Sequence, residues 1–328
     1  MPKVLDSNTP IIASYVLDRN GSGKKISADE ILQWKPEDGL LWLHFNFEHE
    51  HVRNWLDNKL HLDPILVDAL CADESRPRCT TIENGLLTIL RGLNHNAGAE
   101  PEDMVSIRIW IEQGRVITAR RRYMLTEDDL IKSIENGNAP RTTSELLTDI
   151  ALYITSRMHE VIEAMDERLD ELEQFDDIHN TSNVQKTLTD VRREIIQLKR
   201  FMAPQKEVMK RLTTEFSEWF TRRDELNLKE VNDSLMRHIE DLDENRERVH
   251  VIQEQLFARL SELNNQRMYV LSIIAAIFLP LSFATGLLGI NVGGIPGSEN
   301  PGAFAIVSIT LTVVALVLFL LLKVKKWM

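Results

Sequence analysis

Two uncharged apolar runs near the C-terminus constrain the fold of this chain more than any other feature. They cover residues 268–288 and 303–322, and neither contains Asp, Glu, Lys or Arg. Each has about the 20 residues that an α-helix needs to cross the hydrocarbon core of a bilayer. The stretch between them, 289–302, is rich in glycine, proline and asparagine, which favour turns. The sequence therefore predicts two transmembrane helices that form a hairpin.

Positively charged and aromatic residues flank both runs. Lys323 follows the second run and opens a short basic tail, 323–328, which also contains two more lysines and a tryptophan. Arg267 and Tyr269 mark the start of the first run. Because cytoplasmic loops and tails of membrane proteins carry an excess of Lys and Arg, we expect both termini to lie in the cytoplasm. The chain is then a multi-pass membrane protein.

The part of the chain before the first run is strongly acidic. It carries 49 Asp and Glu against 35 Lys and Arg, a net charge of about −14, whereas the whole chain has a net charge of −12. A charge of this sign attracts cations and repels phosphate backbones, so we expect divalent cations rather than nucleic acid as partners. The two cysteines, Cys71 and Cys79, are too few for a disulfide framework and lack the spacing of a zinc knuckle.

The region before the hairpin divides into two parts with different apolar periodicity. Residues 1–142 contain four short runs that are typical of strands, at 40–47, 81–93, 104–112 and 115–121. A helix is expected near 63–73. In residues 143–267 the period becomes helical. We expect an α+β cytoplasmic domain followed by long helices that are divided at Pro204 and near residues 222–226.

One helix is expected to run from near Leu228 into the first membrane run without a break. Its apolar stripe, with a gap only at Arg246, comprises Leu228, Val231, Leu235, Ile239, Leu242, Val249, Ile252, Leu256, Leu260 and Leu263. The opposite face is acidic before the membrane, at Glu240, Asp243, Glu247 and Glu254. Inside the membrane the same face carries small, polar or uncharged residues, namely Met268, Ser272, Ala275, Leu279, Ser282 and Gly286.

This face has two interpretations. The acids can be a solvated surface, and the small residues can be positions where membrane helices pack closely. Alternatively, both halves line a shared lumen for cations, and their continuity on a single face favours this second interpretation. One hairpin cannot enclose a pore, so a conduit requires several copies of the chain around an axis.

The end of the first run carries a resemblance to a known family. Residues 285–291, Thr-Gly-Leu-Leu-Gly-Ile-Asn, resemble the Gly-Met-Asn signature of the CorA-type divalent metal transporters, with Ile290 in place of the methionine. The continuation NVGGIPG and the segment 72–78 are similar to the zinc-transporting ZntB branch of that family. The resemblance implies a CorA-like homopentameric funnel in the bacterial inner membrane. It also implies a long pore-lining helix, a Gly-x-Asn turn at the periplasmic mouth, and zinc transport coupled to protons.

The turn after the first run is the predicted selectivity element: Gly289, Ile290 and Asn291, with Glu299 later in the loop. A ring of Asn291 amide oxygens can accept hydrogen bonds from the water shell of a divalent cation without trapping the ion. Gly289 is expected to supply backbone angles that a bulky residue would resist at the turn. Zinc prefers nitrogen and sulfur ligands, yet neither run contains His, Cys, Asp or Glu. Any preference for zinc must then come from a filter for the hydrated ion, from cytoplasmic ligands, or from geometry that the sequence does not reveal.

Two cytoplasmic segments are candidates for metal binding. Four histidines cluster between residues 44 and 61, and His49 and His51 in Glu-His-Glu-His are the candidate ligand pair. The alternative is a polar start of a helix. A second acidic helix face comprises His159, Glu160, Glu163, Asp166, Glu167 and Asp170.

The pattern as a whole predicts a zinc transporter, with proton-coupled uptake as the leading hypothesis. The spans lack a titratable residue for a proton relay, so a passive Mg²⁺, Co²⁺ and Zn²⁺ channel stays as an alternative, and the direction of zinc movement stays open. A membrane-anchored helical signalling or scaffold protein is the alternative from another class. The sequence has no phosphate loop, nucleophile elbow or zinc-hydrolase motif, so we expect no enzymatic activity and no cofactor.

Overall fold

The structure is a computed structural model of the 328-residue chain. It describes residues 10–73, 76–174, 181–290, 295, 297 and 300–324. The chain divides into two compact units, Met1–Ile252 and Gln253–Met328, which are described separately below.

The first unit is built on a seven-stranded mixed sheet with the order β2-β1-β3-β7-β6-β5-β4. The strands are β1 (Ile11–Leu17), β2 (Gly23–Lys25), β3 (Leu40–Asn46), β4 (Arg78–Ile82), β5 (Gly85–Gly92), β6 (Val105–Glu112) and β7 (Arg115–Arg120). Only the β3 and β7 pair is parallel. Six of the seven residues of β3 are buried, which explains its continuous apolar run in the sequence. The four predicted strand regions are confirmed, whereas β1 and β2 were not predicted.

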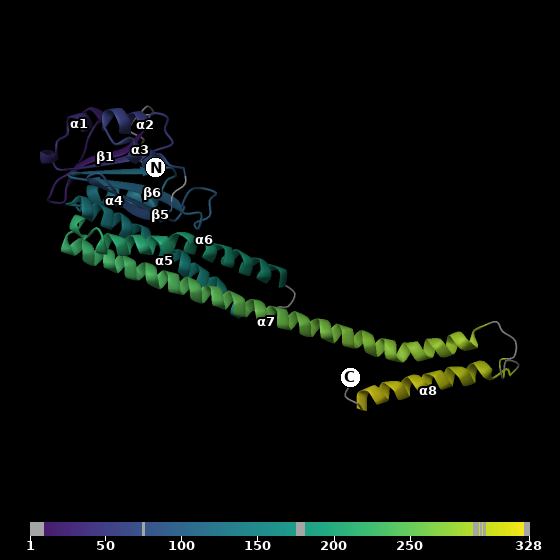
Figure 1. The fold of residues 1–328 in the computed structure, drawn as a ribbon. Coiled ribbons are helices and arrows are strands. Elements are labelled where there is room, and N and C mark those ends of the chain that lie inside the picture. The colour runs from purple at the N-terminus through teal and green to yellow at the C-terminus, as the bar shows by residue number, and fades with distance from the viewer. Residues whose placement is uncertain are drawn as a thin grey trace. The chain divides into compact units, whose positions relative to one another are not determined.

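Short helices cover one face of this sheet (Figure 1). They are α1 (Ala28–Gln33), α2 (Val52–Asn54) and α3 (Pro64–Cys71), with a π-helical turn at Trp55–Lys59 and a 3-10 turn at Pro36–Asp38. Leu66, Val67 and Leu70 of α3 share one apolar core with Leu43 and Phe45 of β3. The Asp63 carboxylate accepts a hydrogen bond from the Ile65 N–H at 2.7 Å, and Pro64 occupies the first turn. The helix predicted near 63–73 is confirmed.

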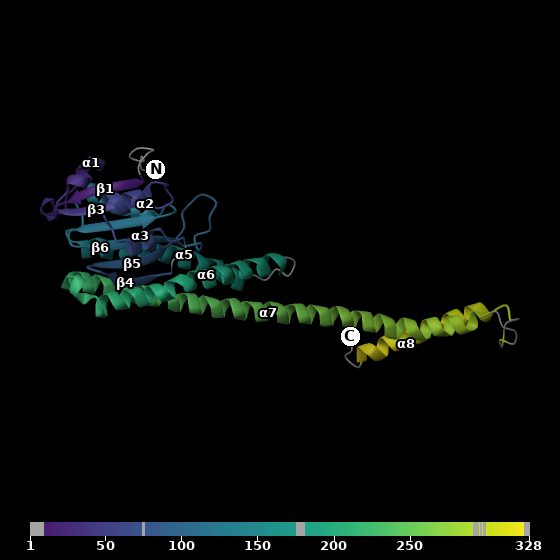
Figure 2. The same cartoon turned by 45° about the horizontal axis from the view of Figure 1, so that its top comes forward.

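On the opposite side of the sheet, longer helices pack against the strands, and the first-unit part of the last of these helices packs on the others (Figures 1 and 2). These are α4 (Leu125–Glu135), α5 (Thr143–Glu173), α6 (Thr181–Thr214) and α7 (Arg222–Leu288), with a 3-10 turn at Ser217–Trp219. Both α5 and α6 contact β5, and α6 also contacts β4. The sheet is thus covered on both faces, as the apolar runs of its central strands require.

The predicted division at Pro204 is wrong, and the one predicted near residues 222–226 exists but lies a few residues earlier in the chain. Proline lacks an N–H and usually interrupts a helix, but α6 continues through Pro204 because buried residues on both sides, including Met202 and Val208, pack it against the sheet. The break lies instead between Thr214 and Arg222. The polar residues after it begin α7, since the Thr221 hydroxyl donates to the Asp224 carboxylate at 2.7 Å and accepts from the Asp224 N–H at 3.3 Å.

The buried side of α7 follows the predicted stripe with two corrections. Leu228, Val231, Leu235, Leu242, Val249 and Ile252 are buried. His238 is buried where Ile239 was expected, and Ile239 is only half-buried. The apparent gap at Arg246 is filled by Asn245, which is 1% exposed and lies three residues after Leu242. Spacing of apolar residues alone could not identify polar members of a buried helix face.

An acidic cluster at the junction of α5 and α7 gives a testable pH dependence. Burial first, and then the charges of Glu145 and Asp224, raise the pKa of Asp149 to about 7. Folded protein therefore holds a proton that unfolded protein releases above about pH 4, and stability falls as the pH rises from about 4 to 7. We expect Asp149→Asn to increase the free energy of unfolding by about 1–3 kcal/mol at pH 8 and by little at pH 4.

Thermal unfolding of the detergent-solubilised protein at both pH values checks this expectation. Glu171→Gln, an exposed change on the same helix, is the matched control. An equal gain from Asp149→Asn at pH 4 and pH 8 would show that the carboxyl group does not titrate as described.

The second unit contains the end of α7 and the helix α8 (Ala303–Val324). Both helices are long and apolar enough to cross a membrane. Their half-buried residues fall on one side of each helix: Ile273, Ile277, Leu281 and Ala284 on α7, and Val307, Leu311, Ala315 and Leu318 on α8. Figures 1 and 2 show α8 returning alongside the last turns of α7. The described helices confirm both predicted spans, and α8 continues to Val324, two residues past the predicted end.

Candidate functional site

The predicted pore-lining face of α7 is uncovered in the single chain. Met268, Ser272, Ala275, Leu279, Ser282 and Gly286 are all exposed, and Leu279 has an exposed fraction of 74%. A helix turns by about 100° per residue, which places this face opposite the half-buried side at Ile277. The hairpin therefore covers one side of α7 with α8 and leaves the predicted pore-lining side open.

Hydroxyl groups on and beside this open face donate to backbone carbonyls of the same helix. The Ser272 hydroxyl donates to the Met268 carbonyl at 2.8 Å, and the Thr285 hydroxyl donates to the Ser282 carbonyl at 3.1 Å. A side-chain carbon added at Gly286 would meet no atom within 4 Å, so this glycine is not required by packing inside the chain. The space over it is open to another helix.

The end of α7 corrects the predicted role of Gly289. The Gly289 N–H donates to the Thr285 carbonyl at 2.9 Å and to the Gly286 carbonyl at 3.2 Å, which closes the last turn. Its φ angle is not positive, in contrast to the prediction of unusual backbone angles. Glycine is favoured here because a side-chain carbon would lie 3.0 Å from the Thr285 carbonyl oxygen. Steric room at the helix end, not backbone freedom, is the requirement.

The predicted selectivity residues are only partly within the described part of the chain. Ile290 is described and is 48% exposed. Asn291 and Glu299 lie outside the described residues. Their role as a filter and as a local negative charge stays a prediction.

The acids of the predicted cation-attracting face are exposed on α7. Glu240, Asp243 and Glu247 belong to the first unit and Glu254 to the second. Asp243 forms an ion pair with Lys199 of α6, so part of its charge is compensated. An exposed ion pair of this kind contributes little to stability. The contribution of Asp243 to local cation concentration is therefore reduced.

The histidine pair lies on the surface between β3 and α2. The ring centroids of His49 and His51 are 5.5 Å apart, but Nδ1 of His49 already accepts a hydrogen bond from the His51 N–H at 3.2 Å. His44, from the same sequence cluster, is fully buried in β3. Among the residues that the structure describes, no group of three His, Cys, Asp or Glu side chains could hold a metal ion. The zinc site at His49 and His51 stays a prediction without a third ligand.

The second acidic face, on α5, is occupied by an arginine from α7. Arg248 donates to Asp170 and, at 2.8 Å, to Glu173, and its guanidinium lies 3.9 Å from Asp166. These contacts join α5 to α7 inside the first unit. The carboxylates are thus partners of a cation that belongs to the chain, and their predicted availability for metal is not supported.

Comparison with known proteins shows which family the chain belongs to. A family model described as CorA-like Mg²⁺ transporter protein matches residues 37–326. The chain belongs to this family. Its members are transporters and not enzymes, so this chain is a divalent cation transporter with two membrane helices at its C-terminal end. The predicted resemblance and the predicted lack of enzymatic activity are confirmed.

Relatives in two branches are similar over nearly the whole chain. The chain is 38% identical over 298 residues to a divalent cation transporter, CmaX, of Pseudomonas aeruginosa, covering 90% of each chain. It is 31% identical over 317 residues to the zinc transport protein ZntB of Yersinia enterocolitica, covering 97% of this chain and 96% of the relative. The solved structure of full-length CmaX superposes with a TM-score of 0.82 at 34% identity, covering 98% of this chain and all of that one. The predicted fold class, an α+β domain followed by long helices and two C-terminal apolar helices, is confirmed.

Proposed function

We propose that this chain moves zinc across the bacterial inner membrane through a pore formed by several identical copies, with proton-coupled uptake as the leading mode. The observation that supports the proposal best is the uncharged face of α7, which α8 leaves uncovered. An uncharged, partly polar face suits a hydrated cation, because it offers hydrogen-bonding groups and no fixed charge that would hold the ion tightly.

A lumen requires several copies of the hairpin arranged with closed symmetry. Two helices cannot surround a lumen, whereas copies around an axis can present one α7 face each toward the centre. Large apolar side chains beside this face, such as Phe278 and Phe283, are also exposed in the single chain. Neighbouring copies or lipid would cover them. Five copies in a CorA-like funnel, with the lipid bilayer around the hairpins and both termini in the cytoplasm, is the arrangement that the family resemblance favours.

Zinc as the cargo rests on the similarity to the ZntB relatives and on the chemistry of the spans. Residues 268–288 and 303–322 contain none of the ligands that bind dehydrated zinc tightly. A hydrated ion that passes neutral hydroxyls and amide oxygens fits this composition. Zinc is then transported cargo and not a cofactor. The same proposal divides the chain into a cytoplasmic α/β domain (1–142), a helical stalk (143–267), two transmembrane helices (268–288 and 303–322) joined by a periplasmic loop (289–302), and a basic tail (323–328).

Flux measurements on proteoliposomes test this function. Zn²⁺ and Mg²⁺ entry should be followed with the pH gradient on, off and reversed. We expect zinc flux above that of protein-free vesicles, and we expect it to respond to the gradient. Zinc flux that is the same with and without the pH gradient would favour a passive channel. The lack of titratable residues in the spans is also consistent with a passive channel. If proteoliposomes that contain the protein show no more divalent cation flux than protein-free vesicles, transport by this chain is contradicted.

The acidic face of α7 should raise the local concentration of cations. We expect the combined change of Glu240, Asp243, Glu247 and Glu254 to the corresponding amides to reduce zinc flux several-fold at low ionic strength. The effect should shrink near 0.15 M salt, because surface charges are screened over about 8 Å there. Flux that is unchanged at low ionic strength would leave these acids as a solvated surface. Changing the exposed Asp29, Glu37, Glu171 and Glu207 in the same way removes four charges elsewhere and is the control for net charge.

A further inference from the structure

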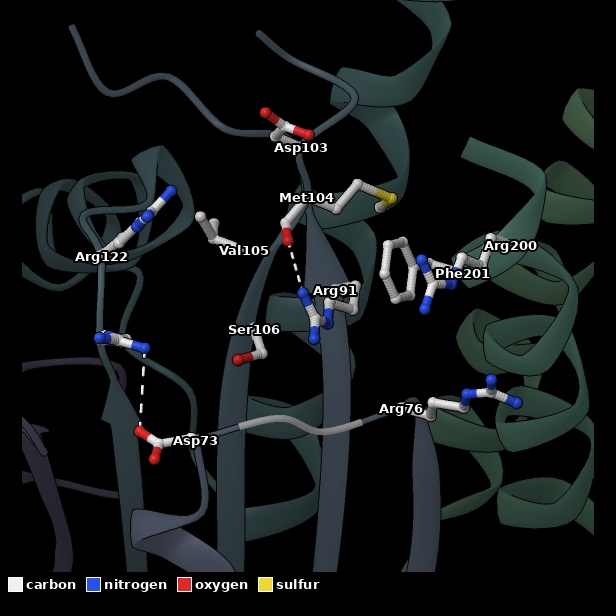
Figure 3. A pocket seen from close by; sticks show the side chains of 11 residues that line it. Asp73, Arg76, Arg91, Asp103, Met104, Val105, Ser106, Arg122, Arg200 and Phe201 are labelled. Carbon is white, nitrogen blue, oxygen red and sulfur yellow. Dashed lines mark hydrogen bonds and ion pairs between the residues drawn. The ribbon is translucent and has the colours of Figure 1, made fainter. Parts of the chain in front are cut away.

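An arginine-rich pocket lies in the first unit. It has a volume of about 430 Å³ and is lined by side chains from β5, β6, α6 and the segments next to β4 and β7. Five arginines line it: Arg76, Arg91, Arg121, Arg122 and Arg200. Figure 3 shows Arg91 in the middle, with Arg122 on one side and Arg76 and Arg200 on the other. The sequence analysis missed this site because these residues are far apart in the chain.

The pocket is positively charged in a chain that is acidic overall. Among the residues that the structure describes, its lining contains two carboxylates, Asp73 and Asp103, against five guanidinium groups. Arg121 is already engaged, because it donates to Glu48 at 2.7 Å and lies 3.8 Å from Asp73. Arginine keeps its charge at any physiological pH, so the excess is permanent. An excess of this kind attracts anions.

Arg91 is held in a fixed position at the base of the pocket. Its Nη1 donates to the Met104 carbonyl at 2.6 Å, and its backbone N–H donates to the Gln205 side chain at 2.7 Å. Its guanidinium also lies 4.4 Å from the ring centroid of Phe201. A group that is ordered before binding loses less entropy when a ligand arrives.

Three of the arginines have no acidic partner within the described ranges of the chain. Arg76, Arg122 and Arg200 are exposed and form no ion pair there, and Arg200 contacts the Phe201 ring at 5.5 Å. Next to the pocket, burial and then the charge of Arg91 lower the pKa of the fully buried Arg108 to about 10.

We propose that this pocket binds a small oligophosphate, a phosphorylated molecule with at least two linked phosphate groups. The guanidinium fork matches phosphate oxygens with two parallel hydrogen bonds, and arginines from separate elements can each take a different phosphate. A cavity of about 430 Å³ exceeds what one tetrahedral anion fills and suits a larger molecule. The pocket shares no residue with the proposed metal path, so a ligand bound there would act as a regulator and not as transported cargo.

Calorimetric titration of the full-length detergent-solubilised protein with tripolyphosphate, without divalent cations, tests the proposal. We expect one site per chain, with orthophosphate and sulfate at equal ionic strength binding at least about tenfold more weakly. The double change Arg122→Gln and Arg200→Gln should weaken tripolyphosphate binding at least about tenfold. Asp103→Asn removes a carboxylate from the lining, and it should strengthen binding.

The matched control is Arg19→Gln with Arg192→Gln, which removes the same charge from exposed positions outside the pocket. It should change the affinity by less than about twofold. Equal weakening by both double changes would mean that the anion follows net charge, and the proposal would be wrong. No binding of tripolyphosphate to the unmodified protein, or no preference over orthophosphate, would also overturn it. Because the readout is binding, these outcomes do not depend on the transport assay.

Discussion

Replacing Asn291 by alanine should abolish or deregulate zinc transport while leaving membrane insertion and assembly intact. The described end of α7 is closed by hydrogen bonds of Gly289, so Asn291 follows two residues after the last helical turn is complete. Several copies of its amide at one axis would present neutral oxygens to the water shell of a divalent ion. Removing the amide removes these acceptors and leaves the burial of both spans unchanged.

Zinc and magnesium flux into proteoliposomes checks this expectation. Asn291→Asp should tighten cation binding and slow release, because a carboxylate binds a divalent cation more strongly than an amide does. Asn300→Ala is the matched control in the same loop, since the Asn300 side chain accepts a hydrogen bond from the Gly302 N–H at 2.8 Å and serves the start of α8. If Asn291→Ala transports zinc at the parental rate with the same discrimination against Mg²⁺, the turn is only a connector.

Replacing Glu127 by alanine should destabilise the first unit by about 3–5 kcal/mol, because it breaks a buried network of charges. His44 is fully buried, with Nδ1 2.7 Å from the Thr118 hydroxyl and Nε2 against the Glu127 carboxylate. Arg120 donates to the same carboxylate at 2.5 Å. Without Glu127, the Arg120 cation would be left without its acidic partner, and His44 would lose its acceptor.

The network also has a direction of pH dependence. Burial acts to raise the pKa of Glu127, but His44 and Arg120 outweigh it and hold the pKa below its ordinary value. The ion pair therefore stabilises the fold above the ordinary carboxyl pKa of about 4, and this stability is lost as the pH falls through the lower pKa of the folded protein.

Thermal unfolding of the detergent-solubilised protein at pH 7 measures the effect of Glu127→Ala. A loss of 3–5 kcal/mol corresponds to a midpoint lower by roughly 6–20 °C in a unit of this size. Glu135→Ala, an exposed change at the end of the same helix, should shift the midpoint by less than about 2 °C. A Glu127→Ala midpoint equal to that of this control would show that the network does not support the fold.

Local sequence patterns were sufficient to predict the two membrane spans and most strands of the sheet. The membrane runs are defined by length and lack of charge, and both properties can be counted in the sequence. Strands β3, β5, β6 and β7 were recognisable because each is a short apolar run bounded by turn residues such as Gly85 and Gly114. Most of β4 was missed, because Arg78–Ile82 is largely polar. In contrast, β1 was missed although it forms a hairpin with β2 and the connection contains Asn20-Gly21, a turn signal that the prediction did not use. Its pairing with β3 joins residues more than 20 positions apart.

Features that depend on distant residues could not be predicted. Pro204 lies inside a helix because the sheet packs against α6, and a helix breaker cannot be recognised as tolerated without that contact. Arg248 and the α5 carboxylates meet only after folding, so the acidic face was interpreted as a candidate metal site. The arginines of the pocket come from β5, α6 and segments beside two other strands. No spacing in the sequence joins them.

The central claim is that the uncovered face of α7 lines the metal path, and thiol labelling tests it directly. In a background with Cys71→Ser and Cys79→Ala, single cysteines should replace Ala275 or Ser282 on that face, and Ile277 on the side toward α8 as the matched control. A charged methanethiosulfonate reagent would then be added while zinc flux into proteoliposomes is measured. We predict strong inhibition for Ala275→Cys and Ser282→Cys and little for Ile277→Cys. Inhibition confined to Ile277→Cys, or absent from all three, would contradict a pore lined by this face.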